Sequence, residues 1–230
     1  MTTPQVGVAG ILEPAYDVAG DSFDYAINDT ITDVAVIDAM GHGLNAALLA
    51  SLAIGAYRHA RRRARAGLAE MYRLMDAAIS GQFGPDQFVT AQMMRLDIAT
   101  GLLQWVNAGH PAALLIRGHR VLRALEGPAT LPVGFGGAVP RVSEQMLRPG
   151  DRVLSFTDGV IEEHRPGGEL FGEQRLREFA ERAGPECVDL QDMVRSLSHS
   201  LLQARGGRTT DDAALFLMEW RGGPTGTTES

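Results

Sequence analysis

Hydrophobic residues in the first third of this chain form strand-like runs and then two stretches with helical spacing. Val6 to Leu12 and Ile31 to Asp38 predict strands, and a third strand over Tyr16 to Ile27 is interrupted at Gly20 and Asp21. From Leu44 to Arg65 the apolar residues take up the period of an amphipathic helix, and Leu68 to Ile79 predicts a second one.

The rest of the chain is dominated by hairpins, followed by two helices and a final strand. The expected strands cover residues 88–98, 102–107, 112–117, 120–125, 139–147, 152–157 and 213–220, and the expected helices cover 174–182 and 190–204. No regular alternation of strand and helix is present. This order predicts antiparallel sheets covered by helices and excludes a doubly wound parallel fold.

Length and composition favour one globular domain. The chain has 230 residues, 45% of them hydrophobic, and no linker divides it. We expect residues 1–221 to form a single domain and the small, polar residues 222–230 to form a disordered tail. Because a strand begins almost at the first residue, we also expect this domain to be a module of a longer protein.

Charge and cysteine content exclude several function classes. The net charge of −7 argues against a nucleic-acid partner. The single Cys187 excludes an intramolecular disulfide and a cysteine-rich metal site. No apolar run reaches the roughly 20 residues that cross a bilayer, and no secretory signal precedes the first strand, so we expect a cytoplasmic protein without a membrane partner.

Aspartates in four short turns carry the chemistry. The turns are Gly20-Asp21-Ser22-Phe23-Asp24, Asp38-Ala39-Met40-Gly41, Thr157-Asp158-Gly159 and Thr210-Asp211-Asp212, each at the end of an apolar run. A single Asp beside Gly is most often an ordinary turn residue. Four of them at strand ends suit a shared site for hard cations, and all-oxygen ligands favour Mg²⁺ or Mn²⁺. Two such ions activate water against a phosphoester.

Other polar residues have simpler interpretations. Five arginines between Arg58 and Arg65 suit a solvated helix C-terminus, and a docking surface for an acidic partner is the alternative. We expect His42 and His110 to be loop imidazoles bonded to backbone. The Gly41-His42-Gly43 segment could instead bind phosphate through free N–H groups. No Gly-x-x-x-x-Gly-Lys loop is present, which excludes that class of nucleoside triphosphatase.

Six motifs together resemble one family. They are Ala-Gly-Asp-Ser-Phe-Asp-Tyr, Asp-Ala-Met-Gly-His-Gly, Asn-Ala-Gly-His-Pro, Leu-Pro-Val-Gly, Thr-Asp-Gly and Thr-Asp-Asp-Ala, in this order between Val6 and Trp220. This series is similar to the metal-dependent Ser/Thr protein phosphatases of type 2C, the PPM family, and most of all to their bacterial SpoIIE/RsbU-like branch.

The resemblance implies a fold and a set of metal ligands. The fold would be α+β, a four-layer α-β-β-α sandwich of two antiparallel sheets flanked by helices, with a dinuclear Mn²⁺ or Mg²⁺ site at one edge. Asp21 would be one ligand, and Asp38 would bridge the ions beside the backbone carbonyl of Ala39. Asp158 and Asp211 would complete the set. Asp211 is preferred to Asp212 because the family ligand is the first residue of its pair, and Asp24 is expected to be structural.

Three departures from the family pattern stand out. Ala39 replaces the more frequent Gly or Val, which a backbone ligand tolerates. Many eukaryotic members have a proposed general acid, a histidine, where this chain has Met40, and His42 does not inherit that role. Those members also hold phosphate with an N-terminal arginine, whereas no Arg precedes Arg58 here. The ions and their water would therefore do most of the phosphate orientation.

The function implied is that of a bacterial phosphoprotein phosphatase. It would hydrolyse phosphoserine or phosphothreonine with a metal-activated water, acting on an anti-sigma-factor antagonist in signalling or stress. The helices at residues 44–80 follow directly from the bridging Asp38, so a partner or regulatory domain bound there would control the site. The alternatives are a catalytically silent binding module with the same fold and a hydrolase of small phosphoesters.

Overall fold

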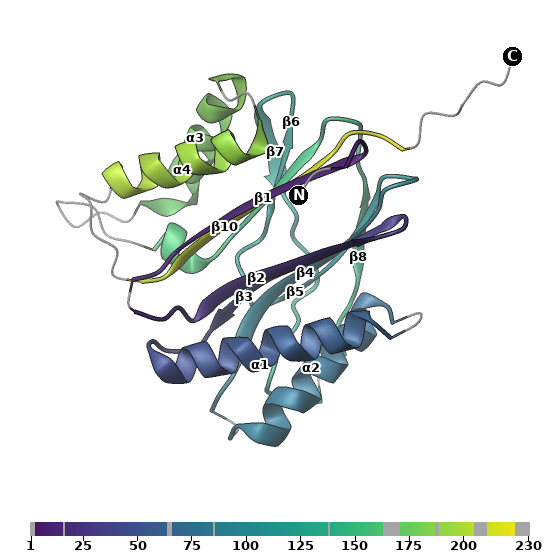
Figure 1. The fold of residues 1–230 in the computed structure, drawn as a ribbon, viewed down its shortest axis with the longest axis vertical. Helices are drawn as coiled ribbons and strands as arrows, with labels where there is room; N and C mark the ends of the chain where they lie inside the picture. The colour runs from purple at the N-terminus through teal and green to yellow at the C-terminus, as the bar shows by residue number, and fades with distance from the viewer. Residues whose placement is uncertain are drawn as a thin grey trace, which may run out of the picture.

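Two five-stranded antiparallel sheets and four long helices make up the fold (Figure 1). The computed structural model describes residues 3–15, 17–63, 66–84, 86–137, 139–162, 171–186, 189–204 and 211–223. Residues 224–230 of the predicted tail lie outside this part of the chain, as does Cys187. Among the described helices, none is long and apolar enough to cross a membrane.

One sheet combines the first and last strands of the chain. Its order is β1 (Val6–Glu13), β10 (Ala213–Trp220), β9 (Arg152–Phe156), β6 (Leu114–Arg117) and β7 (Arg120–Ala124). The second sheet has the order β2 (Asp21–Asn28), β3 (Ile31–Ala39), β4 (Val89–Asp97), β5 (Leu102–Ala108) and β8 (Ser143–Met146). Neighbouring strands are antiparallel in both sheets.

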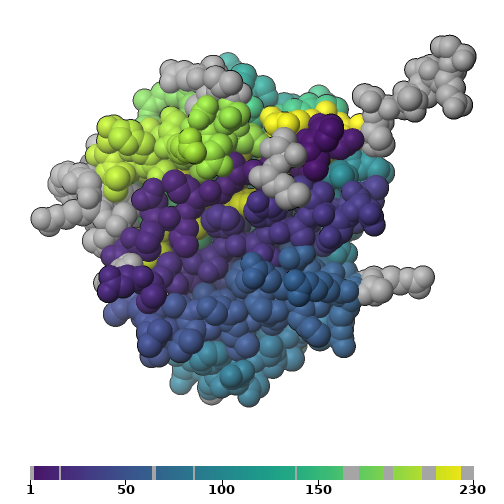
Figure 2. Space-filling model, in the orientation of Figure 1, coloured from purple at the N-terminus to yellow at the C-terminus, as the bar shows by residue number. Residues whose placement is uncertain are grey.

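The helices cover the outer faces of the two sheets and complete four layers. Helices α1 (Leu44–Arg61) and α2 (Leu68–Gln82) pack on the second sheet, and α3 (Gly172–Glu186) and α4 (Leu190–Ala204) pack on the first. In the space-filling view the N-terminal residues, in purple, lie between the green α4 and the blue α1 and α2 (Figure 2). The predicted α-β-β-α sandwich is confirmed.

Burial of both faces explains the continuous apolar runs in the sequence. In β10, Leu215 and Leu217 face α3 and α4, whereas Phe216 and Met218 face the layer between the sheets. Strand β3 divides in the same way, with Ile37 toward α1 and α2 and its neighbours toward the middle. Because side chains alternate across a strand, a strand with two covered faces needs apolar residues at nearly every position.

Several predicted boundaries differ from the structure. Strand β2 begins only at Asp21, because the N–H groups of Ala15 and Gly20 donate to the Asp212 side chain. Helix α1 ends at Arg61, before the predicted Arg65. The predicted strand 139–147 shortens to Ser143–Met146, an edge strand that pairs only with β5.

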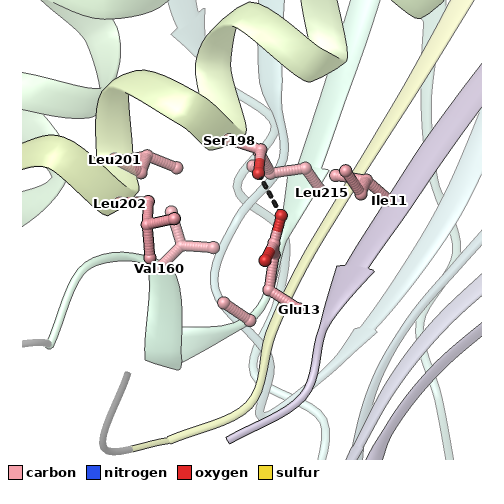
Figure 3. Close-up of a pocket in the computed structure, with 8 residues that line it drawn as sticks. Ile11, Glu13, Val160, Ser198, Leu201, Leu202 and Leu215 are labelled. Atoms are coloured by element: carbon pink, nitrogen blue, oxygen red, sulfur yellow. Dashed lines mark hydrogen bonds between the residues drawn. The ribbon is translucent and has the colours of Figure 1, made fainter. Parts of the chain in front are cut away.

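A small apolar pocket shows how α4 contacts the sheet beneath it. Glu13, the last residue of β1, accepts a hydrogen bond from the Ser198 hydroxyl of α4 (Figure 3). The walls around this pair include Leu201 of α4, Leu215 of β10 and Val160. Val160 ends the short 3₁₀ helix η1 (Asp158–Val160), so this contact joins α4 to the turn that contains Asp158.

The β4–β5 turn depends on a glycine beneath a tryptophan. Gly101 has φ +79°, and a Cβ there would lie 2.5 Å from the Trp220 ring. Gly118 in the β6–β7 turn also has positive φ, +52°, but has open space around it. We expect Gly101→Ala to lower the free energy of unfolding by about 3 kcal/mol, since backbone strain and overpacking add. Gly118→Ala should cost about 1 kcal/mol because only the strain applies.

Urea unfolding of both variants measures the difference between the two costs. Equal losses for the two variants would contradict the contact between Gly101 and Trp220.

Candidate metal centre

Two aspartates, one buried and one half-buried, lie directly opposite each other at one end of the second sheet. Asp21 of β2 and Asp38 of β3 are register partners, and Asp21 is only 3% exposed. Side chains at such positions share a face of the sheet, with Cβ atoms roughly 5 Å apart. Phe23 and Val36, two positions along each strand, face the layer between the sheets, so both carboxylates point to that side. The pair therefore concentrates two negative charges at the sandwich edge.

A threonine from the other sheet fixes the first of these carboxylates. The Thr157 hydroxyl donates to Asp21 Oδ2 at 2.6 Å and accepts the backbone N–H of Ala214 at 2.8 Å. Because the hydroxyl has a single proton, the N–H of Ala214 leaves that proton free for Asp21. The contact joins the two sheets at the site. Thr157 was not among the predicted site residues, although its place directly before Asp158 was a usable signal.

Asp158 and Asp211 come from two loops that touch each other. Asp158 opens η1 after β9 and is half-buried, whereas Asp211 is exposed beside the start of β10. A Cβ on Gly159 would lie 1.9 Å from the Asp212 carbonyl oxygen, so only glycine allows this approach. The predicted Asp-Gly motif is thus explained by a close backbone contact between the loops.

Asp212 has a structural role. Its Oδ1 accepts the N–H of Ala15 at 2.8 Å, and its Oδ2 accepts the N–H of Gly20 at 2.6 Å. Asp212 is buried, and this pair of bonds ties the loop before β2 to the loop before β10. The Asp211 side chain accepts the N–H of Asp212 at 2.9 Å and stays at the surface.

The acidic side chains raise one another's pKa values. Burial raises the pKa of Asp21 to about 8, with further contributions from Asp38, Asp212 and Asp158. Burial raises the pKa of Asp38 to about 7, and the charges of Asp158 and Asp211 add to the effect. The pKa of Asp158 is also raised, first by burial and then by Glu162. Such mutual effects require the carboxylates to lie close together.

Three buried aspartates elsewhere in the molecule pair with arginine, and a fourth, Asp76, accepts the backbone N–H groups of Gly134 and Gly136. Asp24 pairs with Arg58 at 2.7 Å and Arg61 at 3.2 Å. Asp33 and Asp151 pair with Arg95 and Arg117 in the same way. Within the described part of the chain, neither Asp21 nor Asp38 forms an ion pair with an arginine.

The donor set at this edge fits divalent cations. Carboxylate oxygens without a basic partner are the ligands that Mg²⁺ and Mn²⁺ prefer, and a bound cation would offset the repulsion between them. The carbonyl of Ala39 is also near, since a Cβ on Gly20 would lie 3.3 Å from its oxygen. Among the described residues, no three acidic, Cys or His side chains already form a closed metal cage.

The structure also bears on the predictions made for Asp24, for the arginines of residues 58–65 and for the two histidines. Asp24 is structural, as predicted, because it holds α1 against β2 through Arg58 and Arg61. Two of the five arginines expected to be solvated therefore form ion pairs. The ring of His110 bonds to the Thr90 side chain through Nδ1 at 2.8 Å, and the backbone of Phe156 also acts on the ring and raises its pKa. His42 lies exposed in the loop before α1.

Comparisons with known proteins agree with this architecture. Two antiparallel sheets flanked by helices define the class of the type 2C phosphatases, and the structure of the SpoIIE phosphatase domain from Bacillus subtilis aligns with a TM-score of 0.81 at 17% identity, covering 94% of this chain and 63% of that chain. The chain belongs to the stage II sporulation protein E (SpoIIE) family, whose model matches residues 28–221.

Individual relatives are distant in sequence. The phosphoserine phosphatases RsbP and RsbU of Bacillus subtilis (strain 168) are 26% and 22% identical, over 94% and 92% of this chain. The crystal structure of the RsbU and RsbW domains of Rv1364c from Mycobacterium tuberculosis has a TM-score of 0.82 at 27% identity, covering 97% of this chain and 62% of that one. The phosphatase PstP, crystallised with two manganese ions, has a TM-score of 0.66 at 15% identity, covering 94% of this chain and 98% of that one. This chain spans only 52% of RsbP and 62% of RsbU.

The raised pKa values predict a pH dependence of stability in the metal-free protein. In the folded state Asp21 has a pKa of about 8 and Asp38 a pKa of about 7, whereas an unfolded aspartate ionises near pH 3.8. Each residue therefore stays protonated up to a higher pH in the folded protein. The stability that this proton provides is lost as the pH rises through the folded pKa. Between pH 6.5 and 8.5 we expect the free energy of unfolding, measured with urea in excess chelator, to fall by roughly 2 kcal/mol.

Asp21→Asn should remove most of this slope, because the amide does not ionise. A slope unchanged in Asp21→Asn and in Asp38→Asn would contradict the assignment to these two residues.

Proposed function

We propose that this chain is the catalytic domain of a metal-dependent serine/threonine phosphoprotein phosphatase. One observation carries the proposal: the buried Asp21 and the half-buried Asp38 lie opposite each other without an arginine partner in the described part of the chain, and Asp158 raises the pKa of both. Membership of the SpoIIE family supports it. Residues 1–221 are proposed to form one domain, because both sheets contribute to the site.

The proposed ligands for two Mn²⁺ or Mg²⁺ ions are Asp21, Asp38, the carbonyl of Ala39, Asp158 and Asp211. Asp38 would bridge the ions, and the two manganese ions in the PstP crystal structure support a dinuclear site. Asp211 is preferred to Asp212, because both oxygens of Asp212 already accept backbone N–H groups.

The chain's own residues would arrange the reaction. When bound, the two cations would activate a water for attack on phosphorus and orient the phosphate. Asp21 and Asp38 would hold the ions, and the Thr157 hydroxyl would keep Asp21 aimed at them. No arginine precedes Arg58, and Arg58 is bonded to Asp24, so this arginine does not serve as a phosphate clamp.

The proposed substrate is a phosphoserine or phosphothreonine protein, specifically an anti-sigma-factor antagonist in the cytoplasm. The names of RsbP and RsbU as phosphoserine phosphatases support the chemistry, and the joined RsbU and RsbW domains of Rv1364c support a signalling context. A silent binding module and a hydrolase of small phosphoesters are the alternatives that the experiments below separate.

Removal of a proposed ligand should abolish turnover. We expect Asp38→Asn and Asp158→Asn to lower Mn²⁺-dependent hydrolysis of an aryl phosphate by at least about 100-fold, since even changes around metal ligands cost 10–100-fold. Asp211→Asn should behave similarly, and Asp212→Asn should lower the free energy of unfolding because the amide keeps only one of the two oxygens that accept the N–H groups of Ala15 and Gly20.

Asp192→Asn on the exposed face of α4 is the matched control and should retain full activity. Undiminished turnover in Asp38→Asn and Asp158→Asn would overturn the proposal. Wild-type protein that binds Mn²⁺ but hydrolyses nothing would identify the silent module. Faster turnover of nucleotides than of phosphoproteins would identify the small-molecule hydrolase.

Helices α1 and α2 are proposed to receive a partner or a regulatory domain. Leu44 and Leu48 on α1 are 67% and 54% exposed, and α1 begins five residues after Ala39. A shift of α1 would therefore pull on the end of β3 that contains Asp38. This surface supports control of metal binding through residues 44–80.

Hydrogen exchange tests this coupling. We expect amide exchange within residues 44–80 to slow when Mn²⁺ binds, because the bound metal would hold the end of β3 and with it the start of α1. Exchange in β6 and β7, at the far edge of the other sheet, serves as the internal reference. Indifference of residues 44–80 to the metal would exclude this route.

A further inference from the structure

The side chains of Thr90 and the buried His110 lie next to Asp38, one of the proposed metal ligands. Thr90 of β4 is the register partner of Asp38. Its Oγ1 lies 3.5 Å from Asp38 Oδ2 and 2.8 Å from His110 Nδ1. His110 follows β5 and is 6% exposed. The three side chains therefore form a continuous series of contacts from the buried His110 through Thr90 to Asp38.

The backbone around His110 holds the ring in one place. The N–H of His110 donates to Asn107 Oδ1 at 2.9 Å, and Asn107 Nδ2 donates back to the carbonyl of His110 at 2.7 Å. Gly109 has φ +69°, and a Cβ there would lie 2.8 Å from Pro132. A turn fixed on both sides in this way leaves the imidazole little freedom to reorient.

The number of available protons limits which hydrogen bonds Asp38, Thr90 and His110 can form with one another. Burial lowers the pKa of His110 to about 3, so the ring is neutral and has one N–H proton. Its Nε2 is buried beside the backbone of Phe156, which raises the pKa of the ring, and among the described residues no side chain bonds to Nε2. The Thr90 hydroxyl also has one proton, and both Asp38 and the ring compete for it.

One arrangement supplies a hydrogen bond to Asp38. If Nδ1–H donates to Thr90 Oγ1, the Thr90 proton is free to donate to Asp38 Oδ2. If the proton is on Nε2, Nδ1 accepts the Thr90 proton and the Asp38 carboxylate has no donor from this side. Only the first arrangement gives the Asp38 carboxylate a hydrogen-bond donor from this side.

We propose that Thr90 and His110 are positioning residues for metal binding: His110 Nδ1–H orients the Thr90 hydroxyl, which holds Asp38 in the rotamer that receives the cations. This inference rests on the proposed function, because it assigns Asp38 as a metal ligand. Metal-ligating carboxylates are commonly held by such outer hydrogen bonds, whose loss costs 10–100-fold in metal affinity.

Titration calorimetry on chelator-treated full chain tests the hydroxyl. Thr90→Val keeps the shape of the side chain and removes the donor, so the Kd for Mn²⁺ should rise by about 10-fold or more. Thr90→Ser restores the hydroxyl and should bind within about threefold of wild type. Thr32→Val is the matched control, because Thr32 is also buried in this sheet, with an unbonded hydroxyl at the far end of β3. Its metal affinity should not change.

The ring is tested by nuclear magnetic resonance. Nitrogen chemical shifts of the imidazole distinguish Nδ1–H from Nε2–H, and comparison with His110→Ala assigns the signal among the six histidines. We expect the Nδ1–H form in the metal-free protein and in the protein loaded with diamagnetic Mg²⁺. His110→Asn, which keeps an N–H donor near the Nδ1 position, should bind Mn²⁺ more tightly than His110→Ala.

The outcomes separate this inference from the proposed function. Wild-type protein that binds no Mn²⁺ would refute the metal site itself. Wild-type binding with an unchanged Kd in Thr90→Val, or an Nε2–H ring, would overturn the positioning role and leave the phosphatase proposal intact. Circular dichroism melting of each variant confirms that it is folded before its affinity is measured.

Discussion

Burial of negative charge without a basic partner is the constraint on which the rest of this structure depends. Asp21 and Asp38 face each other across β2 and β3, and both have pKa values raised by several units. Acidic side chains with such raised pKa values lower the stability of a fold and are found mainly at functional sites. The same chain neutralises Asp24, Asp33 and Asp151 with arginines, whereas Asp21 and Asp38 have no arginine partner in the described part of the chain.

Neutral hydrogen-bond donors orient the carboxylates at this edge of the sandwich. The Thr157 hydroxyl donates a hydrogen bond to Asp21, and the backbone N–H groups of Ala15 and Gly20 donate to Asp212. Neutral donors fix the direction of a carboxylate without cancelling its charge, which leaves that charge available for a cation. Arginine at the same positions would orient the carboxylates equally well but would compete with the metal.

Much of this arrangement follows from the sequence, for identifiable reasons. The layers were predictable because β3 and β10 are apolar on both faces, and the Asp motifs could be located because each lies at or near the end of a strand-like run. Thr157 and the Thr90–His110 pair were not predicted, since a threonine in a strand and a histidine in a turn have many roles. Their partners lie 136 and 20 residues away, and only the folded chain brings them together.

The place of β10 has a consequence for how the protein is made. Although it is the last strand in the chain, β10 lies between β1 and β9, where it pairs with both. A nascent chain still lacking this strand has a gap in the middle of its first sheet, and the loop containing Asp211 has no anchor. The first sheet and the loop of Asp211 therefore take their final positions late, only after the ribosome has passed Trp220.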